Sequence, residues 1–393
     1  MIPLLAAFAF RFEQTIVELP KPDARAISIQ AILKVPDLGS KDFAKLQIIA
    51  RTIPKQTQPF PRREMMMITD GAPVKCQITP DRIRVVVNVA PGKLKAGISL
   101  LYALMNEATL TQDNLDASEL QVQRVDYWSA ALNPVLVPRV KLGAEEAQVL
   151  YHKVFQIQLA TIAVGGAFRS GEAEALLTAK EAPAPAPKLP QRGVIDRSVL
   201  PVRTEGPGSV STIDLVGPPI VVNDVAIPQK LLALYALGVG KEGSLFRIVR
   251  QKHAWSYRQE AILSPTKDGW VPRLVIASIP FTDATRVKTI QSELLEDVSH
   301  WDEKTRLRAL GMAEAVMLRG VRQDPVYVYG AHPADNSLED ETYLAAYWPV
   351  KAGRPWDQAS LLESMRKVTL ADLKEQAESI VGSAIPRVLQ GQG

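Results

Sequence analysis

The chain has 393 residues, more than one hydrophobic core ordinarily organises, so we expect at least two domains. Its 46 basic and 42 acidic side chains give a net charge of +4, and this near-balance argues against nucleic acid as the main partner. No apolar run is long enough to span a bilayer, and the single cysteine, Cys76, excludes an internal disulfide and a cysteine-rich zinc site.

Residues 1–10 are almost entirely apolar, and Ala7-Phe8-Ala9 within them is similar to a signal-peptidase cleavage site. No basic segment precedes the apolar one, so these residues also fit a first strand or a disordered end. We favour the remnant of a signal peptide, which makes a periplasmic or secreted location the expectation over a cytoplasmic one.

The first half of the chain combines short strand patterns with amphipathic helix patterns. Apolar residues at every second position from Ile27 to Leu33 predict a strand over residues 24–35, and Pro36 and Gly39 end it. Beyond it the hydrophobic period predicts, in order, helices over 42–52 and 63–69, a hairpin of strands 75–79 and 82–89, helices over 94–106 and 116–128, and an apolar helix or strand over 150–164.

Residues 182–192 begin with the run APAPAPKLP, whose prolines keep the backbone extended and out of a core. We interpret this segment as a linker. After it the patterns predict a helix from 231, a helix over 244–251, strands over 257–263 and 270–279, helices over 284–300 and 302–318, and a closing segment over 356–385 in which Thr369 is the N-cap of a helix over 371–380.

The order helix, strand, turn, strand, proline, helix, helix therefore occurs twice. Asp81 matches Asp268 and Pro91 matches Pro280, an offset of about 190 residues that indicates a duplicated domain rather than a solenoid. We predict an α+β fold of two homologous repeats, each a mostly antiparallel sheet with helices packed on one face. The domains are expected at residues 10–181 and 193–393.

A glycine-rich stretch in the second repeat, formed by Gly238, Gly240 and Gly243, matches the dinucleotide-binding pattern G-x-G-x-x-G. That fingerprint requires a strand before its first glycine. Residues 228–237 are rich in leucine and alanine and nearly free of β-branched residues, which predicts a helix. A flexible turn between two helices is the favoured interpretation of the glycines.

The residues around these glycines resemble the C-terminal half-domain of the pitrilysin/insulinase-type metallopeptidases, which include the mitochondrial processing peptidases. The matching runs are Leu237-Gly238-Val239-Gly240, Ser244-Leu245-Phe246, Val249-Arg250-Gln251 and Trp255-Ser256-Tyr257. The resemblance implies that Arg250 and Tyr257 position the substrate. Ala254 departs from it, since the family has glycine there. This segment carries the resemblance, and the remainder of the chain matches by pattern only.

Active members of that family carry H-x-x-E-H, which supplies two zinc ligands and a general base on one helix. The resemblance places the motif on Gln47, Ala50 and Arg51, an amide, a methyl group and a guanidinium. The chain's histidines do not have the motif's spacing: His152, His253, His300 and His332. We therefore expect degenerate zinc-motif positions, with no metal, no cofactor and no catalytic residue on this chain alone.

The resemblance leaves one half of a peptidase site in place. Arg250 can donate a pair of hydrogen bonds to a peptide carbonyl or carboxylate, and Tyr257 can stabilise an oxyanion. The alternative is that Arg250 is an ordinary exposed helix arginine and Tyr257 an ordinary strand aromatic. The basic and aromatic side chains nearby also suggest nucleic-acid binding, which the balanced charge argues against: Arg247, Lys252, His253, Trp255 and Arg258.

The resemblance thus implies a non-catalytic subunit of a heterodimeric zinc peptidase. A homologous subunit with an intact H-x-x-E-H motif would hold the zinc, and this chain would close the chamber and contact the peptide substrate. The alternative is a structural or assembly subunit similar to the core proteins of respiratory complexes, with no peptidase activity. An independent enzyme of unrelated mechanism would need a polar cluster that the sequence does not show.

Overall fold

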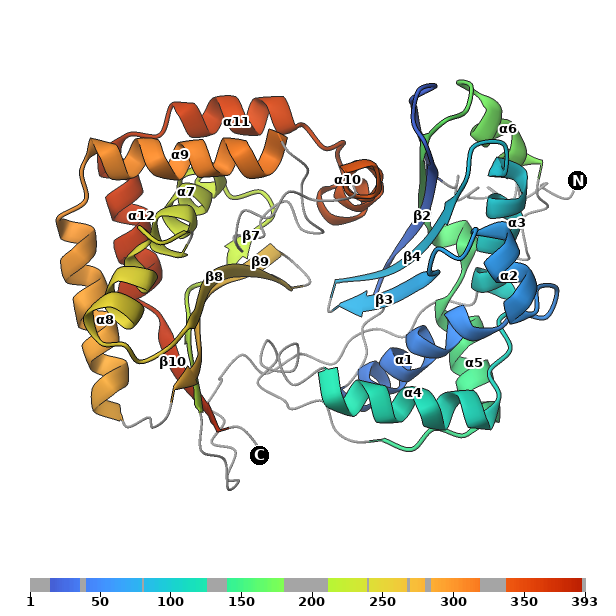
Figure 1. The fold of residues 1–393 in the computed structure, drawn as a ribbon, viewed down its shortest axis with the longest axis horizontal. Coiled ribbons are helices and arrows are strands. Elements are labelled where there is room, and N and C mark those ends of the chain that lie inside the picture. The colour runs from blue at the N-terminus through green and yellow to red at the C-terminus, as the bar shows by residue number, and fades with distance from the viewer. Residues whose placement is uncertain are drawn as a thin grey trace, which may run out of the picture. The chain divides into compact units, whose positions relative to one another are not determined.

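The computed structural model describes residues 15–35, 40–79, 81–125, 140–179, 211–238, 240–266, 269–279, 284–318 and 337–390 (Figure 1). The chain divides into two compact units, of which the first holds elements β1 to α6 and the second holds β6 to β10. The predicted linker, Asp268, Pro280 and residues 1–10 lie outside the described residues. None of the described helices is both long and apolar enough to cross a membrane.

The first unit is built on a five-stranded sheet in the order β1-β5-β2-β4-β3. Strand β2 pairs antiparallel with β4 and β5, and β1 pairs parallel with β5. The strands are β1 (Thr15–Pro20), β2 (Ile27–Lys34), β3 (Lys75–Thr79), β4 (Arg82–Val89) and β5 (Thr161–Gly166).

The six α-helices described in this unit lie on one face of the sheet (Figure 1). They are α1 (Ser40–Thr52), α2 (Arg62–Ile68), α3 (Leu94–Asn106), α4 (Gln112–Val125), α5 (Ala144–Val154) and α6 (Glu172–Thr178). The predicted alternation in β2 fixes which face they cover, because Ile27, Ile29, Ala31 and Leu33 all belong to the core beneath the helices.

The second unit has a sheet in which β9 pairs antiparallel with β6, β7 and β8, while β10 pairs antiparallel with β6. Its strands are β6 (Ser211–Val216), β7 (Ile220–Val221), β8 (Arg258–Thr266), β9 (Gly269–Ile279) and β10 (Ile385–Gln390). The helices are α7 (Ile227–Gly238), a π-helix (Phe246–Lys252), α8 (Ala284–Ser299), α9 (Glu303–Leu318), α10 (Ser337–Ala352), α11 (Gln358–Arg366) and α12 (Leu370–Gly382).

The two sheets share one topology, which confirms the predicted α+β duplication. The strand order β5-β2-β4-β3 in the first unit corresponds to β10-β6-β9-β8 in the second. In each, the first helix follows the second strand of this series, and the longest hairpin is followed by two helices. Both units have mostly antiparallel sheets, and β1–β5 is the one parallel pairing among those described.

A buried polar pair lies at the same place in both sheets. Arg84 on β4 donates from Nε to Gln30 Oε1 on β2 at 2.9 Å, and Arg273 on β9 donates from Nε to Asp214 on β6 at 3.0 Å. In the strand register Arg84 lies opposite Ile32 and Arg273 lies opposite Val216, so each arginine reaches diagonally to a side chain two residues earlier on the neighbouring strand. Arg84 and Arg273 are 189 residues apart, the same separation as Pro91 and Pro280.

Some boundaries differ from the sequence predictions. Strand β8 begins at Arg258, one residue after the predicted start, and the apolar stretch 150–164 is divided between the end of α5 and the start of β5. The predicted helix over 244–251 is largely a π-helix. Strands β1, β6 and β7 and helices α6 and α10 had no prediction.

The Asp214–Arg273 pair allows a stability test, since both side chains are almost fully buried, with 0% and 3% exposure. Asp214→Ala leaves a buried guanidinium without its carboxylate and should lower the free energy of unfolding of the second unit by about 3–5 kcal/mol. The double variant Asp214→Val/Arg273→Met removes both charges and should recover most of that loss.

Denaturant unfolding followed by tryptophan fluorescence measures this effect. The described tryptophans all belong to the second unit: Trp255, Trp270, Trp301, Trp348 and Trp356. An Asp214→Ala variant as stable as the unmodified protein would show that the guanidinium finds another way to be solvated.

Candidate functional site

The degenerate zinc-motif positions lie on α1, in the first unit. Gln47 and Ala50 are buried, with 4% and 1% exposure, and Arg51 is half-buried. The helix end is fixed by Thr52, whose hydroxyl lies 2.9 Å from Ser118 Oγ on α4. An amide, a methyl group and a guanidinium do not make a zinc-binding set, so these residues do not fit the metal. In the described part of the chain no group of three or more His, Cys, Asp or Glu side chains could hold a metal ion.

The glycine-rich stretch lies between α7 and the π-helix, so a helix precedes Gly238, as the leucine- and alanine-rich sequence predicts. A Cβ atom at Gly238 would lie 2.5 Å from the backbone nitrogen of Ala261 on β8, so only glycine permits this approach. Gly240 has φ of 75°, and the carbonyl of Gly243 accepts from the N–H of Arg247 at 3.1 Å. The three glycines therefore turn the chain from one helix into the next, and the structure does not place them as a dinucleotide fingerprint.

Helix α8 holds the start of the following helix. The Ser244 hydroxyl donates to Asp297 Oδ2 at 2.5 Å, Arg247 Nη2 donates to the same carboxylate at 2.7 Å, and Trp301 Nε1 donates to Ser244 Oγ at 3.2 Å. Ser244 is fully buried. Its hydroxyl thus donates to Asp297 and ties the turn to α8.

The helix that carries Arg250 has a π conformation over Phe246–Lys252. The N–H of His253 donates to the carbonyl of Ile248 at 3.2 Å, five residues back. Such wide turns are rare in proteins, and those that occur are often found at functional sites. Ala254 follows with φ of 52°, a left-handed conformation that costs an alanine about 1–2 kcal/mol. This position is the one at which the pitrilysin-type resemblance has glycine, and the backbone explains that preference.

The structure brings Arg250 and Tyr257 together. Ser256 is buried and donates its hydroxyl to the carbonyl of Ala277 on β9, which turns the next side chain outward. Tyr257 is 82% exposed, and the Arg250 Cζ atom lies 3.4 Å from the centroid of its ring. This cation–π contact is worth about 0.5–1 kcal/mol at an exposed site, and it places a guanidinium beside a phenol on one surface.

Comparisons with known proteins address the fold that carries this pair. No protein-family model matches the sequence, and no curated protein matches it. A protease from Helicobacter pylori superimposes with a TM-score of 0.70 at 13% identity, over 96% of both chains. A peptidase M16 inactive domain from Pseudomonas fluorescens gives a TM-score of 0.70 at 14% identity, over 97% of both chains. A chain of complex III2 from Candida albicans gives 0.69 at 12% identity, over 96% of this chain and 93% of that one.

The fold is that of the M16 peptidases. At 12–14% identity the likeness shows architecture alone, so the function has to be argued from the residues of the site. The fold class predicted from the sequence is confirmed. The roles of Arg250 and Tyr257 stay a prediction, although their proximity is a finding.

Beside the Arg250–Tyr257 pair, the M16-like second unit carries a basic and aromatic cluster anchored by Glu293 of α8. Glu293 accepts hydrogen bonds from Lys252 Nζ at 2.9 Å and from His253 Nε2 at 2.8 Å. The His253 ring stacks on Trp255 with centroids 4.0 Å apart, and Arg286 Cζ lies 5.4 Å from the Trp255 centroid. The sequence indicated the bases and aromatics but missed Glu293, because one acid on an amphipathic helix carries no signal of its own.

The charge of Glu293 depends on these contacts. Burial alone would raise the pKa of Glu293, but the hydrogen bonds from Lys252 and His253 outweigh it and lower the pKa. The same bond raises the pKa of Lys252. Glu293 thus stays ionised and holds the end of the π-helix against α8, next to the Arg250–Tyr257 pair.

We expect Glu293→Gln to lower the melting temperature by about 2–4 °C near pH 7, the shift that roughly 1 kcal/mol produces in a domain of this size. Because the pKa of Glu293 is lowered on folding, its stabilisation is complete above the unfolded value of about 4.3 and is lost as pH falls below it. The difference between the two proteins should therefore shrink as pH falls from the unfolded value through the lowered pKa of the folded state. Melting curves recorded at a series of pH values from 7 downward test this, with the exposed Glu375→Gln as control. A difference that stays the same over the whole acidic series would contradict the role of the charge.

Proposed function

We propose that this chain is the non-catalytic subunit of a heterodimeric pitrilysin-type zinc peptidase. A homologous subunit with an intact H-x-x-E-H motif would carry the zinc, and this chain would close the peptide chamber. The observation that supports the proposal is the exposed Arg250–Tyr257 stack in a chain whose motif positions are Gln47, Ala50 and Arg51. One half of a peptidase site has the chemistry to bind peptide, and the other half has no metal ligand.

The stack supplies two kinds of hydrogen-bond donor to a peptide. A guanidinium that rests on an aromatic ring keeps its N–H edges free of the ring face, so it can donate two parallel bonds to a carbonyl or carboxylate. The phenol of Tyr257 can donate to a carbonyl oxygen as that oxygen becomes negative in the transition state. Neither group needs a metal on this chain, which therefore has no cofactor of its own under this proposal.

The second candidate is a structural or assembly subunit with no peptidase activity. The likeness to a chain of complex III2 from Candida albicans, with a TM-score of 0.69, favours it. In that case the Arg250–Tyr257 stack would serve only to hold the π-helix against the start of β8. The two candidates differ in whether a zinc-bearing partner and a peptide need this surface. The periplasmic or secreted location remains a prediction from residues 1–10.

A reconstitution experiment separates the candidates. We expect the purified chain alone to leave an unfolded peptide intact and to contain no stoichiometric zinc by elemental analysis. Mixed with a homologue that carries H-x-x-E-H, it should form a complex that cleaves the peptide and contains one zinc per heterodimer. Cleavage by this chain alone, after contaminating peptidases are removed, would refute the proposal. A stable complex without cleavage would favour the structural subunit.

Within that complex, Tyr257→Phe should reduce kcat by about 10²-fold, as expected for the loss of one oxyanion donor. The melting temperature should change little, because the residue is 82% exposed. Tyr102→Phe is the matched control, since it removes a hydroxyl that donates to Leu177 in the first unit. That variant should leave kcat unchanged.

Arg250→Ala in the same complex should raise KM as well, since a positioning contact is lost in both the ground state and the transition state. Arg63→Ala, at an exposed position on α2, is its control. If the Tyr257→Phe complex folds and its kcat is unchanged, the Arg250–Tyr257 stack is a structural contact with no part in catalysis.

A further inference from the structure

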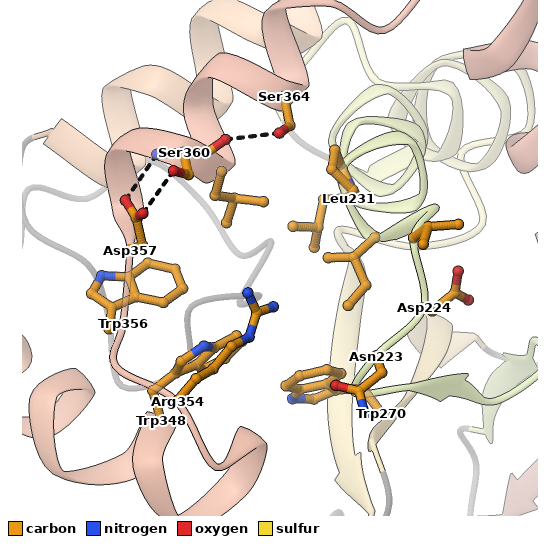
Figure 2. Close-up of a pocket in the computed structure, with 14 residues that line it drawn as sticks. Asn223, Asp224, Leu231, Trp270, Trp348, Arg354, Trp356, Asp357, Ser360 and Ser364 are labelled. Carbon is orange, nitrogen blue, oxygen red and sulfur yellow. Dashed lines mark hydrogen bonds between the residues drawn. The ribbon is translucent and has the colours of Figure 1, made fainter.

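A pocket of about 580 Å³ lies in the second unit, apart from the Arg250–Tyr257 pair (Figure 2). Its walls come from the turn before α7, the first turns of α7, the end of α10, helix α11 and the first residues of β9. The volume lies within the range of roughly 300–1,000 Å³ that is typical of small-molecule sites. Nothing in the proposed peptidase role uses this pocket.

Local sequence explains how the chain forms its mouth. Helix α10 ends at Ala352, and Gly353 follows in the left-handed conformation, with φ of 65° and its N–H bonded to the carbonyl of Pro349 at 3.0 Å. The turn directs Arg354 and Trp356 to the pocket. Asp357 then begins α11 by accepting from the backbone N–H of Ser360 at 2.9 Å.

Three tryptophans make the aromatic wall. Trp348 stacks on Trp270 with centroids 5.6 Å apart, and Trp356 meets Trp348 edge-on at 4.9 Å. Trp270 and Trp348 are 1% and 7% exposed, so packing holds the wall in place. Leu231 of α7 lies on the opposite side (Figure 2). An apolar ligand body would find a rigid aromatic surface here.

The two acidic side chains of the pocket, Asp224 and Asp357, already accept hydrogen bonds from other groups of the protein. Asp224 pairs with Lys230 at 2.5 Å; burial alone would raise its pKa, but the bonds from Lys230 and the Ala226 N–H lower it. Asp357 accepts from the Ser360 hydroxyl at 2.6 Å as well as from its N–H, and these bonds, with a smaller effect of the nearby Arg354 charge, lower its pKa.

One donor in the pocket, the guanidinium of Arg354, is not used in this way. Figure 2 shows the guanidinium of Arg354 projecting between the tryptophans and Leu231, and among the described residues no acceptor is hydrogen-bonded to it. A cation beside an aromatic wall favours a ligand with oxygen acceptors on an apolar body.

We propose that this pocket binds a carboxylate attached to an aromatic or large apolar group. Arg354 donates to the carboxylate, and the apolar group packs against Trp348, Trp356 and Leu231. Two sources share this chemistry: a free aromatic acid, and the C-terminal residue of a peptide that ends in an aromatic side chain. The proposal does not depend on the peptidase role, because no residue is common to the two sites.

The test is a titration of the full chain, followed by tryptophan fluorescence and by calorimetry. The probes are 3-phenylpropionate and its amide, and the tripeptide Ala-Ala-Phe with a free or an amidated C-terminus. We expect at least one of the two acids to bind saturably, and the corresponding amide to bind at least 10-fold more weakly. Preference for phenylpropionate over the tripeptide would identify a small-acid site, and the reverse preference a peptide C-terminus.

Arg354→Gln keeps most of the side-chain volume and should weaken binding of the preferred acid by about 10- to 100-fold, the loss expected for a charged hydrogen bond. Arg63→Gln, at an exposed position in the first unit, should bind like the unmodified protein. The acid-against-amide comparison on the unmodified protein needs no variant, so it holds even if Arg354→Gln folds poorly. Equal binding of acid and amide, unchanged binding by a folded Arg354→Gln, or no saturable binding of any probe would each overturn the proposal.

Discussion

The close approach of α7 to β8 is the constraint on which the second unit depends. A side chain at Gly238 would overlap Ala261, so the helix can end against the strand only with glycine there. Every residue of α7 from Leu231 to Leu237 is buried, which makes this helix the centre of the unit. Its end leads through the glycine-rich turn to the π-helix and Arg250, and its beginning forms a wall of the tryptophan pocket. Both candidate sites therefore rest on the placement of one helix.

The two repeats show how a duplicated architecture separates its chemistry. Helix α1 occupies in the first repeat the place of α7 in the second, directly after the equivalent strand. The first repeat has buried Gln47 and Ala50 on that helix, and the second has a helix buried from Leu231 to Leu237, followed by Arg250 and Tyr257. The buried polar pair on the sheet also differs between the repeats. It is an Arg84–Gln30 hydrogen bond in the first and the Arg273–Asp214 ion pair in the second. The same backbone thus carries different side-chain chemistry in each repeat, which is why the fold alone does not state the function.

Strain and anchoring are concentrated around the Arg250–Tyr257 pair. The π-helix and the left-handed Ala254 are both unfavourable conformations, and the buried contacts of Ser244 with Asp297 and of Ser256 with Ala277 hold the chain on either side of them. Local strain persists only where surrounding structure determines the conformation. The same anchoring contacts therefore also fix where the exposed cation–π pair lies.

The sequence by itself determined the elements whose side chains repeat with a regular period. The alternation from Ile27 to Leu33 identified β2, and the Thr369 cap was confirmed as a capping box with Asp372. The offset between Pro91 and Pro280 gave the duplication, and the resemblance gave the Arg250–Tyr257 pair. These features are local or repeated, so the hydrophobic period of one segment, or the residue types at one helix end, is enough to predict them.

Tertiary structure alone decided features that no period in the sequence marks. The π conformation of residues 246–252 and the 3.4 Å approach of Arg250 to Tyr257 are visible only in the folded chain, and the buried Arg273–Asp214 pair forms because β6 and β9 lie side by side. Trp270 and Trp348 are 78 residues apart and form a pocket wall only because α10 ends beside the start of β9. No period in the sequence encodes such a meeting, since it follows from the packing of whole helices and strands around a core.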